Sequence, residues 1–340
     1  GMLGTKKMIS DSAMSNSPSL KDIAEAITKK DTWAIFVHER PDGDAIGSGS
    51  AFYCWGTEIG KKCFWGGTHP VPRVYEFLPH VDVYQVLENI PYDLKSPDSA
   101  IIVLDTSNLE RCVAGLDDNN LTLIVNIDHH MDNQMFGHLN YVDPTSSATA
   151  EIIWDLFKES WQPISRDALL GIYTGIVTDT GHFTYSNTTP KTHTIAHDVL
   201  SAGINPENIF RHIYANRRLS GLRLWGFAFM RAFSLSDGKA VVSWIKLEDF
   251  EKLNADPYDA EGIVNQLLYV KGATISALLT EGEDEVRISF RSVTGISVRE
   301  LAQKWDGGGH PQAAACKLSL PLERALDLVS QELEEYAKNV

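Results

Sequence analysis

The first half of the chain alternates between amphipathic segments and short, nearly continuous apolar runs. Residues 19–30 predict a helix, because Ser19 can cap its start and apolar residues recur at helical spacing. The apolar runs predict strands that are buried on both faces of a sheet, and they fall at 33–37, 100–107 and 121–130. Further helical patterns follow or separate them, at 47–60, 146–160 and 166–180. This alternation predicts an α/β domain over residues 19–190, built on a doubly wound, mostly parallel sheet.

The pattern changes twice in the second half. Residues 191–234 are predominantly helical and predict a connector. After the turn signal Asp237-Gly238, β-type alternation predominates, and the chain ends in a long acidic amphipathic helix. We therefore expect a second, smaller α+β domain over residues 235–340. The Ser-rich segment 1–18 is expected to be disordered.

Composition narrows the class of protein. The chain has 340 residues, 43% of them hydrophobic, and 30 Lys and Arg against 45 Asp and Glu, a formal net charge of −15. This acidity argues against a long nucleic-acid duplex as the main partner, because every phosphate contact needs a cation. Bound divalent metals or a local basic pocket would still accommodate a short anionic substrate.

The same composition indicates a cytoplasmic protein. No apolar stretch is long enough for a membrane span, and no apolar run follows the N-terminal lysines as in a secretory signal. The four cysteines are far apart, which favours buried thiols over disulfides or a thiolate zinc site.

Acids and histidines follow each of the three strongest apolar runs. They comprise His38, Asp42 and Asp44 after the first run, Asp105 after the second, and Asp128, His129 and His130 after the third. Asp179 stands at the end of a predicted helix, where a carboxylate opposes the helix dipole and needs a positive partner. Taken singly, each acid could be a turn or a helix cap. Because parallel strands present their carboxyl ends together, the combination predicts a two-metal site with about six ligands.

A glycine-rich segment near the C-terminus has the composition of an anion site. Gly307, Gly308 and Gly309 can bring backbone N–H groups to an anion, and His310 adds a donor there. Upstream, Arg291 and Ser292 lie in a predicted strand, and Arg suits phosphate recognition. A glycine turn and a solvated basic face are the alternative interpretations.

These clusters, in this order, resemble the motifs of the DHH phosphoesterase family. The family is named for an Asp-His-His motif, here Asp128-His129-His130. The segment Gly307–His310 resembles the Gly-Gly-Gly-His signature of the DHH-associated C-terminal domain. The resemblance covers nearly the whole chain, from about residue 20 to residue 340.

The resemblance implies a role for each residue. One Mn²⁺ would bind His38 and Asp42, a second would bind Asp44, His129 and Asp179, and Asp105 would bridge the two, with Mg²⁺ or Co²⁺ as alternative metals. Asp128 would orient the histidines, and His130 would lie near the scissile phosphate. The substrate would be held across an interdomain cleft by residues of the second domain, namely Arg291, Ser292, Gly308, Gly309 and His310.

The resemblance also implies an activity. Compact two-domain members hydrolyse short oligoribonucleotides (nanoRNA) to mononucleotides and remove the 3′-phosphate from adenosine 3′,5′-bisphosphate (pAp). Two alternatives stay open: hydrolysis of cyclic dinucleotides or their linear products such as pApA, and a non-catalytic nucleotide-binding regulator. The aromatic residues between Trp225 and Phe233 are compatible with a homodimer or with the core of the connector.

Overall fold

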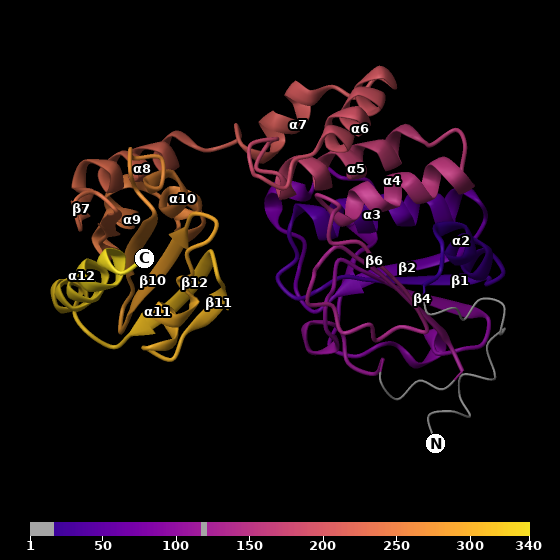
Figure 1. Ribbon diagram of the computed structural model, residues 1–340, viewed down its shortest axis with the longest axis horizontal. Coiled ribbons are helices and arrows are strands. Elements are labelled where there is room, and N and C mark those ends of the chain that lie inside the picture. The colour runs from indigo at the N-terminus through magenta and orange to yellow at the C-terminus, as the bar shows by residue number, and fades with distance from the viewer. Residues whose placement is uncertain (1–16, 117–120) are drawn as a thin grey trace. The chain divides into compact units, whose positions relative to one another are not determined.

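Six parallel strands form the central sheet of the N-terminal part of the chain (Figure 1). The structure is a computed structural model that describes residues 17–116 and 121–340; the predicted disordered segment 1–18 lies almost wholly outside these residues. The strands, in spatial order, are β3 (Gln85–Val86), β2 (Lys62–Gly67), β1 (Thr32–Phe36), β4 (Ser99–Leu104), β5 (Leu123–Asp128) and β6 (Leu139–Val142). This order confirms the expected doubly wound, parallel sheet.

The two faces of this sheet are covered differently. Four helices pack on one face (Figure 1), namely α2 (Leu20–Thr28), α3 (Gly43–Glu58), α4 (Thr149–Ser160) and α5 (Arg166–Asp179). Along β1, Trp33 and Ile35 belong to the core beneath these helices, whereas Ala34 and Phe36 belong to a smaller core on the other side. Loops and 3₁₀ turns between residues 87 and 116 cover that second face. Successive side chains of a strand point to opposite faces of the sheet. Because both faces are covered here, nearly every residue of the run is apolar.

Glycines let two of these helices touch through their backbones. A Cβ atom on Gly47 of α3 would lie 2.3 Å from the carbonyl oxygen of Gly171 of α5, and a Cβ on Gly171 would lie 2.4 Å from that of Gly47. The close approach brings Asp44 of α3 near Asp179 at the end of α5.

Strand β2 is not among the strands that the sequence predicts. The pair Gly66-Gly67 has the composition of an isolated turn, yet these glycines are the last two residues of β2 and pair with β3. A Cβ on Gly66 would lie 2.3 Å from the carbonyl oxygen of Gln85, so the glycine permits a close strand contact rather than a chain reversal.

The C-terminal part of the chain forms a second compact unit, from Asn216 to Val340, after a first unit that ends at Ala215. Its mixed sheet comprises β11 (Gly308–His310), β12 (Ala313–Leu318), β10 (Val286–Ser292), β9 (Ile275–Glu281), β8 (Ala240–Ile245) and β7 (Phe233–Leu235) in spatial order. Its helices are α8 (Leu219–Arg231), α9 (Leu247–Leu253), α10 (Ile263–Leu267), α11 (Arg299–Gln303) and α12 (Leu322–Lys338). The expected α+β character is confirmed, and the pairing of β8 with β9 is parallel.

The predicted connector is helical but contributes to both units. Helices α6 (Pro190–Ser201) and α7 (Pro206–Ile213) supply Ile195, Val199 and Ile209 to the core of the first unit. Helix α8 supplies Leu224 and Ala228 to the second. The domain limits at residues 190 and 235 stay predictions. Among the described residues, no helix combines the length and apolarity needed to cross a membrane.

Candidate metal centre

The first candidate ligands follow two neighbouring strands. His38 lies two residues beyond the end of β1, and Asp105 follows β4 directly. Strands β1 and β4 are paired, and the chain proceeds from them toward opposite edges of the sheet. This is the position where doubly wound sheets bind ligands, because the loops diverge there and leave the strand ends accessible.

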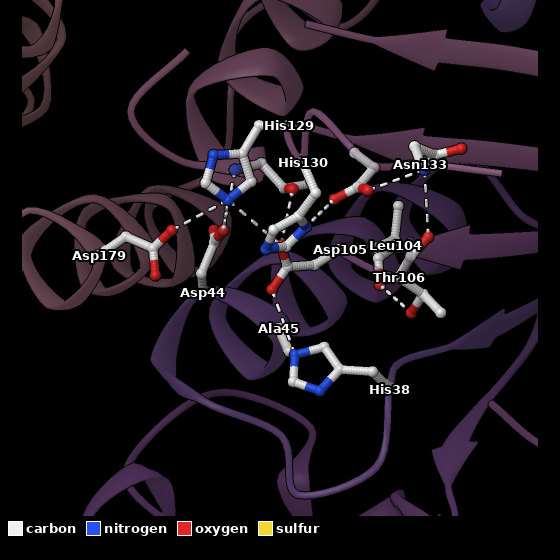
Figure 2. Close-up of polar contacts among 12 residues, drawn as sticks. His38, Asp44, Ala45, Leu104, Asp105, Thr106, His129, His130, Asn133 and Asp179 are labelled. Carbon is white, nitrogen blue, oxygen red and sulfur yellow. Dashed lines mark hydrogen bonds and ion pairs between the residues drawn. The ribbon is translucent and has the colours of Figure 1, made fainter. Parts of the chain in front are cut away.

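Asp105 faces two sets of side chains with its two carboxylate oxygens (Figure 2). Its Oδ2 lies 3.4 Å from Nε2 of His38, and its Oδ1 lies 3.5 Å from Nε2 of His129. The backbone of Asp105 is left-handed, with φ of 57°, a conformation that Asp tolerates better than most residues. The chain can therefore turn sharply after β4 and present the carboxylate at the strand end.

Two further carboxylates come from the N-terminus of α3. Asp42 is the N-cap of this helix and accepts a hydrogen bond from the backbone N–H of Ala45 at 2.9 Å. Asp44 is the second residue of the helix and is fully buried. Both of its oxygens accept backbone hydrogen bonds from the start of α4, from Thr149 at 2.9 Å and Ala150 at 3.0 Å.

His129 lies at the centre of a second group of acids (Figure 2). Its Nε2 is 3.1 Å from Oδ2 of Asp179 and 3.6 Å from Oδ2 of Asp44. Asp179 is the last residue of α5. The basic side chain of His129 thus lies against this carboxylate at a helix C-terminus.

Backbone carbonyls orient the imidazoles of His38 and His129. The Nδ1–H of His38 donates to the carbonyl of Glu39 at 2.6 Å, and that of His129 donates to the carbonyl of Ser146 at 3.1 Å. In each ring this leaves Nε2 directed at the carboxylates. Such a second hydrogen bond is typical of metal-binding histidines, because it fixes the ring and its tautomer.

His130 belongs to a separate polar chain. Its Nδ1 lies 2.6 Å from Oδ1 of Asp128, and Oδ2 of Asp128 accepts a hydrogen bond from the side-chain amide of Asn133 at 2.8 Å. The same Nδ1 is 3.8 Å from Oδ1 of Asp105. The His130 side chain is 39% exposed, whereas Asp128 is fully buried, so a buried acid orients a partly accessible imidazole.

Without a cation, the cluster retains protons. Burial, and then the negative charge of Asp179, raise the pKa of Asp44 to about 8. Burial also raises the pKa of Asp105 well above its ordinary value, with the charge of Asp44 adding to the effect. For His129, burial opposes protonation, but the contact with Asp179 and the charges of Asp44 and Asp105 outweigh it and raise the pKa to about 11. Carboxylates held so close together need positive charge among them.

The residues fit divalent cations. Their ligand atoms form three groups, in each of which all atoms lie within 4.8 Å of one another: His38 with Asp42 and Asp105, Asp44 with His129 and Asp179, and Asp105 with His129 and His130. Asp105 Oδ2 and His129 Nε2 are buried and lack a hydrogen-bond partner within the described residues. A set of carboxylate oxygens with some imidazole nitrogen suits ions such as Mn²⁺ or Mg²⁺.

The predicted substrate residues lie in the second unit. Gly308, Gly309 and His310 form β11 and pair with β12. Gly309 has φ of 137°, and a Cβ on it would lie 2.5 Å from the carbonyl oxygen of Ala313, so only glycine fits there. Ser292 is buried and its hydroxyl donates to the carbonyl of Ile296. Arg291 is half-buried and donates to the carbonyl of Phe290 at 2.9 Å.

Two contributors to the site were missed in the sequence. The Thr149 hydroxyl donates to Oδ1 of Asp105 at 3.0 Å. The Asn133 amide contacts Asp128, as well as Oδ1 of Asn126 at 2.8 Å. Both are ordinary polar residues in a helix start and a loop, and no local pattern separates them from surface residues.

Comparison with known proteins gives two family matches. The model of the DHH family, N-terminal domain, matches residues 32–176, and that of the DHHA1 domain matches residues 237–339. The first contains most of the candidate site residues, namely His38, Asp42, Asp44, Asp105 and Asp128–His130, and the second contains the glycine-rich strand β11.

Curated relatives match along most of their length. The chain is 32% identical over 302 residues to the bifunctional oligoribonuclease and PAP phosphatase NrnA of Thermus thermophilus, covering 88% of this chain and 89% of the relative. It is 33% identical over 310 residues to the protein of the same name from Bacillus subtilis, covering 87% and 92%.

Solved structures agree with this assignment. An exopolyphosphatase-related protein from Bacteroides fragilis superposes with a TM-score of 0.84 at 27% identity, over 94% of this chain and 96% of that one. An exonuclease RecJ bound to manganese gives a TM-score of 0.53 at 14% identity over 96% of each chain, a likeness of fold alone. Together, the two domain matches and the relatives above 30% identity show that this chain belongs to the DHH family and carries a C-terminal DHHA1 domain.

Proposed function

We propose that this protein is a metal-dependent phosphoesterase, working with two Mn²⁺ ions, that hydrolyses short oligoribonucleotides to mononucleotides and dephosphorylates pAp. The observation that carries the proposal is the position of Asp105, whose two oxygens face two separate groups of candidate ligands. The names of the NrnA relatives supply the substrate class.

The proposed ligand sets follow the grouping of side chains. His38 and Asp42 would hold one cation, Asp44, His129 and Asp179 the other, and Asp105 both. Two divalent cations in such a site supply an activated water and neutralise the charge of the phosphoryl oxygens. The chain's own part is to hold the ligand carboxylates in fixed orientations, through the helix starts of α3 and α4, so that little reorganisation is needed.

Acid–base chemistry is assigned to His130. Its Nδ1 is hydrogen-bonded to buried Asp128, which orients the ring for proton transfer. The partly exposed ring would meet the substrate phosphate beside Asp105. Arg291, Ser292, Gly308, Gly309 and His310 of the second unit are the proposed substrate-binding residues, although the Ser292 hydroxyl would have to act while bonded to Ile296.

Each reaction consumes one water. A phosphodiester bond of a short RNA is exchanged for a hydroxyl and a phosphate monoester, and pAp gives AMP and inorganic phosphate. Assembly as a homodimer and a cytoplasmic location stay predictions.

The test is a parallel assay with Mn²⁺. It follows labelled RNAs of two to five nucleotides, a long RNA, pAp and cyclic di-AMP, each with a chelator control. We expect rapid turnover of the short RNAs and pAp, sparing of the long RNA, and silence with chelator. Turnover of cyclic di-AMP alone would contradict the proposal. It would favour the activity named for a more distant relative, the cyclic-di-AMP phosphodiesterase PdeA of Listeria monocytogenes. That relative is 26% identical, and the match covers 46% of its length. Metal binding without turnover of any substrate would favour a non-catalytic regulator.

A further inference from the structure

Thr149 contacts two of the candidate ligand carboxylates at once. It is the first residue of α4 and is fully buried. Its hydroxyl donates to Oδ1 of Asp105 at 3.0 Å, and its backbone N–H donates to Oδ2 of Asp44 at 2.9 Å. One residue therefore links the carboxylate that follows β4 to the carboxylate inside α3.

The hydroxyl of Thr149 is not used as a helix cap. The N-cap of α4 is Ala148, whose methyl side chain cannot accept a hydrogen bond from the first turn. Asp44 takes that place, because its two oxygens accept the N–H groups of Thr149 and Ala150. Thr and Ser at a helix start usually accept hydrogen bonds from backbone N–H groups of the first turn. A Thr hydroxyl that donates to a carboxylate of another element needs a different explanation.

The hydroxyl selects one rotation of the Asp105 carboxylate. The terminal torsion of Asp is broad and nearly two-fold, so the two oxygens are not distinguished by the side chain itself. Within the described residues, the Thr149 hydroxyl is the hydrogen-bond donor to this carboxylate, and Asp105 Oδ2 has none. Oδ1 is thereby held on the side of His129, and Oδ2 is left facing His38.

We propose that Thr149 is a positioning residue of the metal centre: its hydroxyl fixes the Asp105 carboxylate so that one oxygen serves each group of ligands. The inference rests on the proposed function, because it assumes that both groups hold cations. Hydrogen-bond partners of metal ligands typically contribute about 10–100-fold to metal affinity.

The test measures Mn²⁺ binding to the full chain by isothermal titration calorimetry, with no substrate present. Thr149→Val removes the hydroxyl but keeps the shape and the backbone N–H, and Thr149→Ala serves as a second variant should the valine crowd the site. Thr149→Ser restores a hydroxyl. The matched control is Thr174→Val, since Thr174 is also fully buried in a helix, and its hydroxyl donates at 2.9 Å to Leu170 within α5.

We expect Thr149→Val and Thr149→Ala to bind Mn²⁺ at least about tenfold more weakly than the wild type, and Thr149→Ser and Thr174→Val to stay within about twofold. Melting of the metal-free proteins, recorded in chelator, separates positioning from a purely structural role. A lower melting temperature of Thr149→Val with wild-type Mn²⁺ affinity would overturn the inference and leave the proposed function intact. Failure of the wild type itself to bind Mn²⁺ would overturn both.

Discussion

At the scale of single residues, the centre depends on one carboxylate placed by its backbone. Asp105 has left-handed φ, and its N–H donates to the carbonyl of Ile127 at 2.9 Å, so the turn after β4 is tied to the neighbouring strand β5. The side chain is buried among other acids, where burial and the charge of Asp44 raise its pKa. A negative charge is unfavourable at this position until a cation compensates it.

Replacing this charge by a neutral amide tests that arrangement. Asp105→Asn keeps the shape of the side chain, so we expect the metal-free protein to melt no lower than the wild type. We expect turnover of pAp to fall by about a thousandfold or more. The candidate ligands act together, so the loss of one costs nearly as much activity as the loss of all of them. Steady-state kinetics at saturating Mn²⁺ measure this loss. A folded variant with near-normal turnover would remove Asp105 from the centre.

The protons held by the metal-free cluster predict how metal affinity varies with pH. The pKa of Asp44 is about 8 and that of His129 about 11, both above the ordinary values of 3.8 and 6.5. The contribution of these protonated groups to folding stability is complete at pH values below their ordinary pKa. It is lost as the pH rises through the raised pKa of the folded protein. A cation must displace these protons, so we expect Mn²⁺ to bind more tightly at about pH 8 than at about pH 6.

Calorimetric titrations in two buffers of different ionisation enthalpy would detect the released protons. Equal affinity at both pH values, with no proton release, would mean that the cluster does not exchange protons for the cation.

At the scale of elements, local signals were predictable and contacts between elements were not. Ser19 was expected to cap the first helix, and it does so in a capping box with Asp22. The helix predicted at 146–160 begins at Thr149, where its first N–H groups bind Asp44 of another helix. Strand β2 was missed because its close contact with Gln85, rather than its composition, explains its glycines.

The same distinction applies to the metal centre. Acids and histidines at strand ends are visible in the sequence, because parallel strands bring their ends together. The roles of Thr149 and Asn133 depend on hydrogen bonds across the fold, which leave no periodic trace.

An ion pair between two helices, α8 and α9, stabilises the second unit. Arg231 at the end of α8 donates from two nitrogens to Asp249 in the first turn of α9, at 2.5 Å and 2.9 Å. Arg231→Ala would leave this buried carboxylate without its main partner, and we expect a loss of roughly 1.5–3 kcal/mol in the free energy of unfolding at neutral pH. Urea unfolding measures it, with Arg223→Ala, an exposed position on the same helix, as control.

This loss should depend on pH. Burial opposes ionisation of Asp249, but the hydrogen bonds from Arg231 outweigh it and lower its pKa. The contribution is therefore complete above the ordinary carboxylate pKa and is lost as the pH falls through the lowered value. The difference in the free energy of unfolding between Arg231→Ala and the wild type should therefore become smaller at acid pH. A difference that stays constant with pH would show that Arg231 acts through packing alone.

At the scale of the whole molecule, the two proposed tasks, metal binding and substrate binding, fall in different units. All candidate metal ligands lie between His38 and Asp179 in the first unit, and all proposed substrate-binding residues lie between Arg291 and His310 in the second. With these roles, the net charge of −15 would present no conflict with an anionic substrate, because cations would offset the carboxylates and the second unit would supply donors.

This division predicts a variant that affects binding alone. We expect His310→Ala to raise the Michaelis constant for pAp by roughly tenfold, the effect of one hydrogen bond to a charged group, with turnover and Mn²⁺ affinity nearly unchanged. His197→Ala, an exposed histidine of the first unit whose side chain is 78% accessible, is the control. A collapse of turnover at a constant Michaelis constant would assign His310 to the chemistry instead.

The central claim is that Asp105 joins two cation positions, and anomalous diffraction at the manganese edge tests it most directly. A crystal of the full chain soaked in Mn²⁺ should show two peaks about 3.5–4 Å apart. One should lie beside His38 and Asp42 and the other beside Asp44, His129 and Asp179, with Asp105 touching both. A single peak, or peaks that do not contact Asp105, would contradict the account.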